Sequence, residues 1–148
     1  MKKLLLAWFV VASAPAALAG VWVNPGFYSY HFEHDKDLKN VNTGFGAETT
    51  INDTYSATMG VFHNSDHHTS RYLGLYVMPY KIGAVKAGAA VGVFNGYPKV
   101  RDGDWFPAVI PAIAIEGARL GLNMSFVPTV GNRLHSAVIF QIKYNVTP

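Results

Sequence analysis

The chain contains no cysteine and few charged residues, which make up 14% of its 148 residues. The lack of cysteine excludes both a disulfide framework and a cysteine-ligated metal centre. Two of the twelve Lys and Arg residues lie at positions 2 and 3, so ten bases face nine acids beyond residue 19. This near balance gives no argument for nucleic-acid binding. Beyond residue 19, no stretch of the length of a membrane-spanning helix is free of polar interruption, which excludes a transmembrane helix there.

The first 19 residues have the pattern of a secretory signal peptide. Lys2 and Lys3 precede an apolar run at 4–11, and small residues then lead to Ala17-Leu18-Ala19, an A-x-A cleavage site. We therefore expect residues 1–19 to be a signal peptide and residues 20–148 to be exported. The exported part has 129 residues, enough for one domain and not for two.

Alternation with a period of two dominates the rest of the sequence. Around position 30, aromatic Tyr28, Tyr30 and Phe32 alternate with polar side chains, and the pattern recurs to Tyr144. Turn residues divide the chain into eight predicted strands at 26–34, 43–51, 54–63, 70–79, 84–95, 106–116, 118–127 and 134–144. Tight turns at Asn52-Asp53 and Gly117 contrast with longer polar connections, notably 35–42, 64–69 and 96–105. The pattern predicts an all-β fold, an eight-stranded antiparallel up-and-down transmembrane barrel with its long loops outside the cell.

The two faces of each predicted strand follow from parity. We place the aliphatic rows outward, toward lipid, and the polar and glycine-rich rows inward. The outward rows are Leu73, Leu75 and Val77; Val85, Ala87, Ala89, Val91 and Val93; Leu120, Leu122, Met124 and Phe126; and Val138, Phe140, Ile142 and Tyr144. A soluble barrel or sandwich with the apolar face inward is the alternative. It fits less well, because a water-facing surface would carry more charge than this chain has.

Charged and aromatic residues at particular positions carry further expectations. Glu48, Lys86, Glu116 and Arg119 fall on the inner face, where we expect them to neutralise one another as a plug. Trp22 and Trp105 are expected at the two membrane interfaces as belt residues.

Three local patterns occur in order and suggest a family. These are Gly44-Phe45-Gly46 at the second strand, Phe62-His63-Asn64-Ser65 after the third, and the prolines Pro107, Pro111 and Pro128. Together they make the chain, over residues 27–144, resemble the lipid A palmitoyltransferase family of small outer-membrane barrels, known as PagP. The resemblance implies a barrel that binds one acyl chain and transfers it from a phospholipid to lipid A.

The resemblance also implies site residues at the extracellular rim. Ser65 matches the family's serine, and Asn64 falls where an acid is expected. For the family's histidine, both His31 and His34 are candidates; parity favours His31, which lies on the inner face. Histidine can act as a base near neutral pH, Ser65 as a nucleophile or an orienting hydroxyl, and Asn64 only as a positioning amide.

The prolines and glycines complete the expected site. Proline removes a ladder donor, so Pro107, Pro111 and Pro128 mark interruptions in strand pairing. In the family such interruptions are lateral openings for a lipid chain; the alternative is that they sit at strand ends or an edge bulge. On the inner face, Gly74, Gly88 and Gly92 would leave room for the acyl chain.

No cofactor is expected and no dedicated metal site, since the histidines and acid at 63 and 66–68 lack the spacing of one and fit a solvated loop. The expected partners are phospholipid, lipid A, the membrane and the outer-membrane assembly machinery, which would recognise Tyr144 near the C-terminus. We expect a monomer in the outer membrane of a Gram-negative bacterium. A non-catalytic lipid-binding or surface-shielding barrel of the same fold is the second hypothesis, and a soluble periplasmic barrel holding an apolar ligand is the third.

Overall fold

A computed structural model describes residues 20–147, which form a closed antiparallel barrel. The predicted signal peptide at 1–19 lies outside the described residues, as does Pro148. The strands are β1 Val21–His31, β2 Val41–Thr50, β3 Tyr55–His63, β4 Thr69–Ile82, β5 Val85–Phe94, β6 Phe106–Glu116, β7 Leu120–Val127 and β8 Ala137–Asn145. One short 3-10 helix, η1 Arg101–Gly103, interrupts the loop between β5 and β6. Within this part of the chain, no helix is long and apolar enough to cross a membrane.

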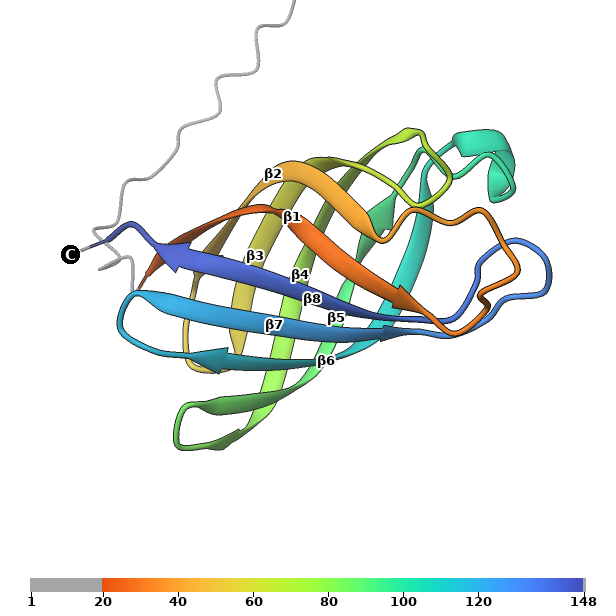
Figure 1. The fold of residues 1–148 in the computed structure, drawn as a ribbon. Helices are drawn as coiled ribbons and strands as arrows, with labels where there is room; N and C mark the ends of the chain where they lie inside the picture. The colour runs from red at the N-terminus through yellow and green to blue at the C-terminus, as the bar shows by residue number, and fades with distance from the viewer. Residues whose placement is uncertain (1–19, 148) are drawn as a thin grey trace, which may run out of the picture.

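Each strand pairs with its neighbours in sequence, and β1 pairs with β8 to close the barrel. Short turns at 51–54, 83–84 and 117–119 lie at one end of the barrel, the end that also carries both termini of the described chain (Figure 1). The longer loops 32–40, 64–68, 95–105 and 128–136 lie at the opposite end. The predicted up-and-down topology is therefore confirmed.

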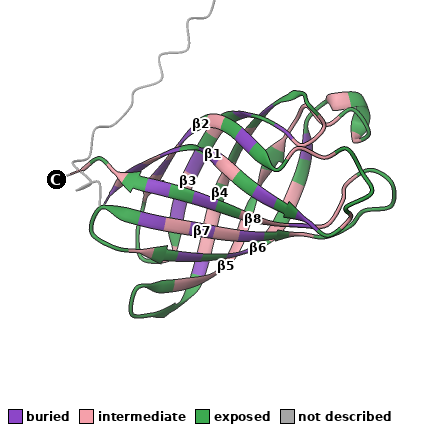
Figure 2. Ribbon diagram, in the orientation of Figure 1, coloured by how far each residue is buried: buried purple, intermediate pink, exposed green. Residues whose placement is uncertain are grey.

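Exposed and buried residues alternate along most of the strands (Figure 2). The outward side chains are apolar: Leu73 is 54% exposed, and Val91, Leu120 and Ile142 are also exposed. The buried residues are predominantly polar: Asn24, Ser29, His31, Asn42, Glu48, Ser56, Thr58, Asn64, Ser70, Asn123, Ser125, Gln141 and Lys143. An aliphatic exterior around a polar interior is the arrangement of a membrane barrel, and it contradicts the soluble alternative, in which the apolar face would be inside.

The first strand begins earlier than the pattern predicted, at Val21 instead of 26. Its register with β2 shifts between Asn24 and Gly26, at a bulge around Pro25. Gly26 has φ of +102°, and a Cβ at this position would lie 2.0 Å from the carbonyl oxygen of Asn42, so only glycine fits. The bulge shifts the register within β1. Residues 21–25 therefore do not continue the period-two alternation from which the strand was predicted.

Candidate functional site

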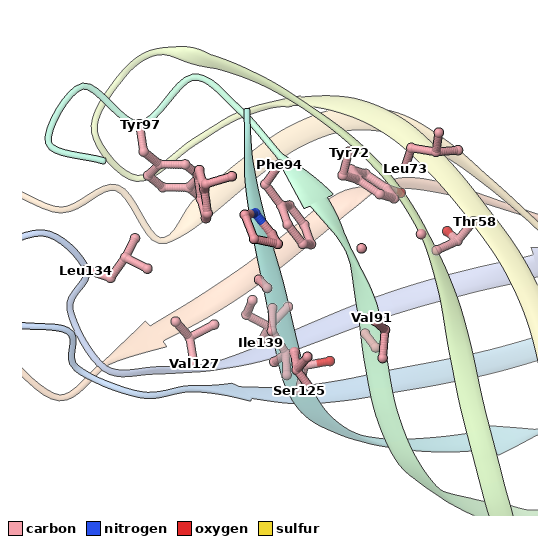
Figure 3. A pocket seen from close by; sticks show the side chains of 18 of the residues that line it. Thr58, Tyr72, Leu73, Val91, Phe94, Tyr97, Ser125, Val127, Leu134 and Ile139 are labelled. Atoms are coloured by element: carbon pink, nitrogen blue, oxygen red, sulfur yellow. The ribbon is translucent and has the colours of Figure 1, made fainter. Parts of the chain in front are cut away.

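The loop end of the barrel contains an apolar cavity of about 490 Å³, a size within the usual range for small-molecule sites. Aromatic rings surround it: Phe27, Phe62, Tyr72, Phe94 and Phe106 belong to its wall, several of them in mutual ring contact. Figure 3 shows Val127, Ser125 and Ile139 reaching it from β7 and β8, and Tyr97 and Leu134 from loops at this end of the barrel. The cavity can hold an apolar chain in contact with aromatic side chains.

The barrel wall is interrupted between β6 and β7 beside this cavity. The two strands pair only between 112–116 and 121–125, so the first half of β6, residues 106–111, pairs with β5 but not with β7. Val109, an outward-facing residue of this unpaired half, also borders the cavity, which therefore reaches the outer face of the barrel.

The three prolines lie around this interruption. Pro107 and Pro128 line the cavity, and Pro111, which shares the outward phase of Pro107 on β6, lies at the last position before the β6–β7 ladder begins. Pro128 also directly follows the end of β7 at Val127, so the strand-end interpretation describes its position as well. A proline cannot donate to a neighbouring strand, which keeps these edges from pairing.

The three glycines expected to leave room for a chain also allow adjacent strands to approach closely. Gly74 and Gly92 line the cavity and face each other across β4 and β5; Gly88 does not line it. At Gly74 and Gly92 an added Cβ would lie 2.6 Å and 2.5 Å from a carbonyl oxygen of the neighbouring strand, and at Gly88 1.9 Å. These glycines allow close approach of adjacent strands, since a side chain there would collide with backbone.

A second, smaller cavity of about 50 Å³ lies at the rim and brings two of the predicted site residues together. His31 and Ser65 both line it, although they come from β1 and from the loop after β3. The rim cavity and the apolar cavity share the lining residues Phe27, Tyr97, Val127, Arg133, Leu134 and Ile139. The rim cavity is thus a neighbour of the apolar one, and the two share part of their wall.

Hydrogen bonds hold His31 and Ser65 in place. The Nδ1–H of His31 donates to Asn40 Oδ1 at 2.9 Å, because an amide oxygen can only accept. This bond leaves Nε2 of His31 as the acceptor nitrogen. The hydroxyl of Ser65 donates to Asn42 Oδ1 at 3.4 Å, and Asn42 in turn donates to Ser29 Oγ at 2.8 Å. The arrangement gives a base and a hydroxyl in one polar network.

Asn64 does not face this network. Its side chain is fully buried, and its Nδ2 donates to Ser70 Oγ at 2.8 Å and to the carbonyl oxygen of Gly96 at 2.7 Å. Its Oδ1 accepts from the backbone N–H groups of Asp66 at 3.0 Å and His68 at 2.9 Å. The amide therefore joins two loops and has no donor left for an oxyanion.

Sequence reasoning missed several residues of the rim. Asp66, Tyr97, Arg133 and His135 line the rim cavity, and none was assigned a role there. Burial raises the pKa of the Tyr97 phenol far above its ordinary value, and the Asp66 carboxylate raises it further, so Tyr97 stays neutral and able to donate. Parity could have found His135, because it shares the inward phase of Gln141 on the predicted strand 134–144.

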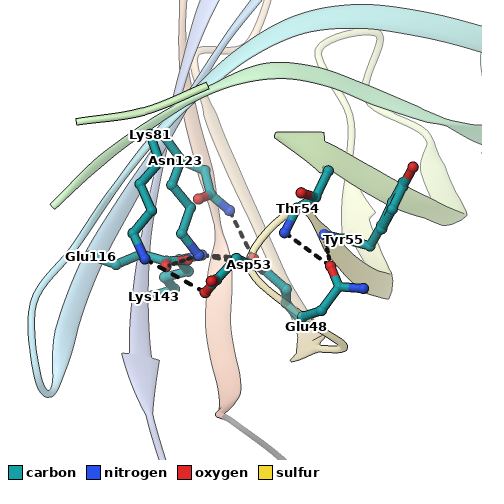
Figure 4. A network of polar contacts seen from close by, with 10 residues as sticks. Glu48, Asp53, Thr54, Tyr55, Lys81, Glu116, Asn123 and Lys143 are labelled. Atoms are coloured by element: carbon teal, nitrogen blue, oxygen red, sulfur yellow. Dashed lines mark hydrogen bonds and ion pairs between the residues drawn. The ribbon is translucent and has the colours of Figure 1, made fainter. Parts of the chain in front are cut away.

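An ionic network closes the opposite end of the barrel (Figure 4). Lys143 Nζ contacts Glu48 Oε1 at 2.9 Å and Glu116 Oε1 at 2.7 Å, and Lys86 Nζ contacts Glu116 Oε2 at 2.8 Å. The nitrogen of Asn123 adds a hydrogen bond to Glu48 Oε2 at 3.0 Å. The predicted neutral plug thus includes Glu48, Lys86 and Glu116, with Lys143 at its centre.

Two predicted placements near the plug are wrong. Trp22 is only 4% exposed, and Lys143 Nζ lies over its ring at 4.8 Å, so it is an interior residue and not a belt residue. Arg119 is exposed and donates to the carbonyl oxygens of Asn145 and Thr147, which keeps it out of the plug. Trp105 is exposed beside the loop end. Within residues 20–147, no group of three metal-ligating side chains gathers.

Comparisons with known proteins bear on the fold alone. The solution NMR structure of the de novo designed TMB2.3, a transmembrane barrel, matches with a TM-score of 0.60 and 13% sequence identity, covering 87% of this chain and 95% of that one. No family model matches, and no curated protein matches. The chain is thus an eight-stranded up-and-down barrel with the fold of a transmembrane barrel, and its likeness to the palmitoyltransferases rests on the sequence motifs.

Proposed function

We propose that this barrel resides in the outer membrane of a Gram-negative bacterium, binds one acyl chain, and transfers it from a phospholipid to lipid A. The observation that carries the proposal is the adjacency of the two cavities: a base and a hydroxyl, His31 and Ser65, line a small rim cavity that shares part of its wall with the apolar one. An ester with a long chain has the matching shape, because its tail is apolar and its carbonyl is polar.

The proposed chemistry follows from the rim network. His31 Nε2 takes the proton of the attacking hydroxyl, whose oxygen bonds to the acyl carbonyl carbon. The tetrahedral intermediate then collapses, the bond to the glycerol oxygen breaks, and that oxygen takes up a proton. Ser65 serves as nucleophile or orients the substrate. The neutral phenol of Tyr97 is a hydrogen-bond donor beside the same cavity.

Lipid access in this proposal is lateral. The unpaired half of β6, with Pro107, Pro111 and Pro128 around it, gives a chain in the outer leaflet a route through the wall into the apolar cavity. Phospholipid, lipid A and the surrounding membrane are the proposed partners. The assembly machinery would recognise Tyr144 during insertion, and the barrel would act as a monomer.

A transfer assay tests this function. Membranes containing the protein should move radiolabelled palmitate from phospholipid to lipid A, and His31→Ala should abolish the transfer because the base is gone. His34→Ala is the matched control, since His34 is exposed on the neighbouring loop and should be dispensable. Wild-type membranes that transfer no more label than empty-vector membranes would exclude the proposal.

A second function, a non-catalytic lipid-binding or surface-shielding barrel, is favoured by one observation. Asn64 is at the position where the family's acid is expected. Both N–H groups and the oxygen of its side-chain amide are used in hydrogen bonds that join two loops. A barrel of this kind would co-purify with lipid, show no turnover, and be indifferent to Ser65→Ala.

Acyl transfer and lipid binding both require the acyl chain to occupy the apolar cavity. Ala90→Phe adds a ring to the inner face of β5 at the cavity wall, and we expect it to shorten the longest fatty acid retained in native mass spectrometry. Ala89→Phe, one residue earlier on the outer face, should leave that length unchanged. Equal chain-length limits in the two variants would show that lipid binds elsewhere.

A further inference from the structure

A second histidine lies in the rim cavity, and it is paired with a carboxylate. His135, in the loop before β8, donates its Nδ1–H to Glu33 Oε2 at 2.9 Å. The His135 side chain is 9% exposed and that of Glu33 32% exposed, so the contact is shielded on the histidine side. The pairing joins the first loop, 32–40, to the last, 128–136.

His135 and His31 border one small cavity. His31 pairs with Ala137 across β1 and β8, and His135 lies two residues before that partner. Both histidines line the cavity that Ser65 also lines. Their Nδ1 partners differ in charge: a neutral amide oxygen, Asn40 Oδ1, for His31, and a carboxylate for His135.

The difference in partners suits the two histidines to different roles. A neutral partner orients an imidazole through one ring nitrogen. The other nitrogen is then placed to accept a proton, as a base must. A carboxylate partner orients the ring and also stabilises the imidazolium. Ester transfer needs both activities, because one proton leaves the attacking hydroxyl and another must reach the departing oxygen.

We propose that His135 is a second catalytic residue of this site, the acid that protonates the leaving oxygen of the acyl donor, and that Glu33 is its positioning residue. The inference rests on the proposed acyl transfer. As the bond between the acyl carbon and the glycerol oxygen breaks, its electron pair stays on that oxygen, which takes the Nε2 proton of the His135 imidazolium. His31 holds the proton of the attacking hydroxyl, and its transfer through solvent to His135 restores both rings.

The identity of the leaving group tests this role. A glycerol alkoxide needs protonation to leave, whereas p-nitrophenolate leaves without it. In the intact barrel in detergent, we expect His135→Gln to lower kcat on a phospholipid donor by about 100-fold and on p-nitrophenyl palmitate by only a few-fold. Glu33→Gln should show the same selectivity more weakly, with KM unchanged. His31→Gln should impair both donors alike, because both reactions need the base.

The results separate the inference from the function on which it rests. A wild-type protein that turns over both esters, together with a His135→Gln variant that equals it on both or loses equally on both, would overturn the role of His135 and leave acyl transfer standing. If the wild-type protein turned over neither donor, both the role of His135 and the proposed acyl transfer would be overturned. Amide hydrogen exchange of loops 32–40 and 128–136 in His135→Gln shows whether the loops keep their structure, and Ser136→Ala on the same loop is the matched control.

Discussion

At the scale of single residues, Lys143 is a buried cation held between two carboxylates. It is 1% exposed and contacts both Glu48 and Glu116, which are themselves buried or nearly so. Removing a charge from water costs several kcal/mol, and only close opposite charges offset that cost. The network ends on Lys86, so two bases balance two acids inside the barrel.

Loss of Lys143 should therefore destabilise the barrel strongly. Lys143→Met keeps much of the side-chain volume but leaves Glu48 buried without a cation, and we expect the free energy of unfolding to fall by about 3–5 kcal/mol. Urea titration of the barrel in lipid vesicles measures this change. Lys36→Met, in an exposed loop, is the control and should change little. A loss below about 1 kcal/mol for Lys143→Met would contradict the ionic account of the plug.

At the scale of elements, β6 differs from the other strands because half of it lacks a partner on one side. Unpaired strand edges normally invite pairing with other chains. Pro107 and Pro111 prevent this at the edge of β6, because proline offers no N–H and obstructs a neighbouring strand. The same residues that keep the wall open therefore also protect it.

The open edge should be visible in amide hydrogen exchange. In detergent micelles we expect the amides of Val109 and Phe126, which point into the interruption, to exchange at least about tenfold faster than the paired amides in 112–116 and 121–125. Strand β5 pairs with both neighbours and serves as the protected reference. Uniform protection along β6 would mean that the ladder with β7 is complete in solution.

At the scale of the whole molecule, the distribution of polarity is that of a barrel surrounded by lipid. Aliphatic and aromatic side chains cover the outside of the strands, while the amides, hydroxyls and ions lie inside. The strands of the described chain pair along most of their length, with breaks at the β6–β7 interruption and at the register shifts of β1 and β4. Closure of the sheet is what allows a backbone to satisfy its hydrogen bonds in a membrane.

A charge on the outer face should therefore be costly. Ile142→Arg places a cation on the lipid-facing side of β8, and we expect it to lower the free energy of unfolding in vesicles by about 2–4 kcal/mol. Asn132→Arg, in an exposed loop, should have little effect. If Ile142→Arg were as stable as the wild-type protein, the outer face would not contact hydrocarbon.

The repeating polarity of the sequence was enough to predict the barrel, its strand number and its faces. Each strand end was placed within a few residues, except at β1, where the bulge at Pro25 and Gly26 breaks the period. The neutral plug could also be predicted, because Glu48, Lys86 and Glu116 fall on the inner phase of their strands. These features depend on the alternation of polar and apolar residues, which can be recognised from adjacent positions in the sequence.

Closure of the sheet decided the rest, because it determines which distant residues meet. It turned Trp22 inward against Lys143, put Asn64 between two loops, and set the rim cavity of His31 and Ser65 beside an apolar one. It also paired His135 with Glu33, which are 102 residues apart in the chain. A period of two says which way a side chain faces but not what it faces; that depends on strand register and loop path, which form only when β1 meets β8.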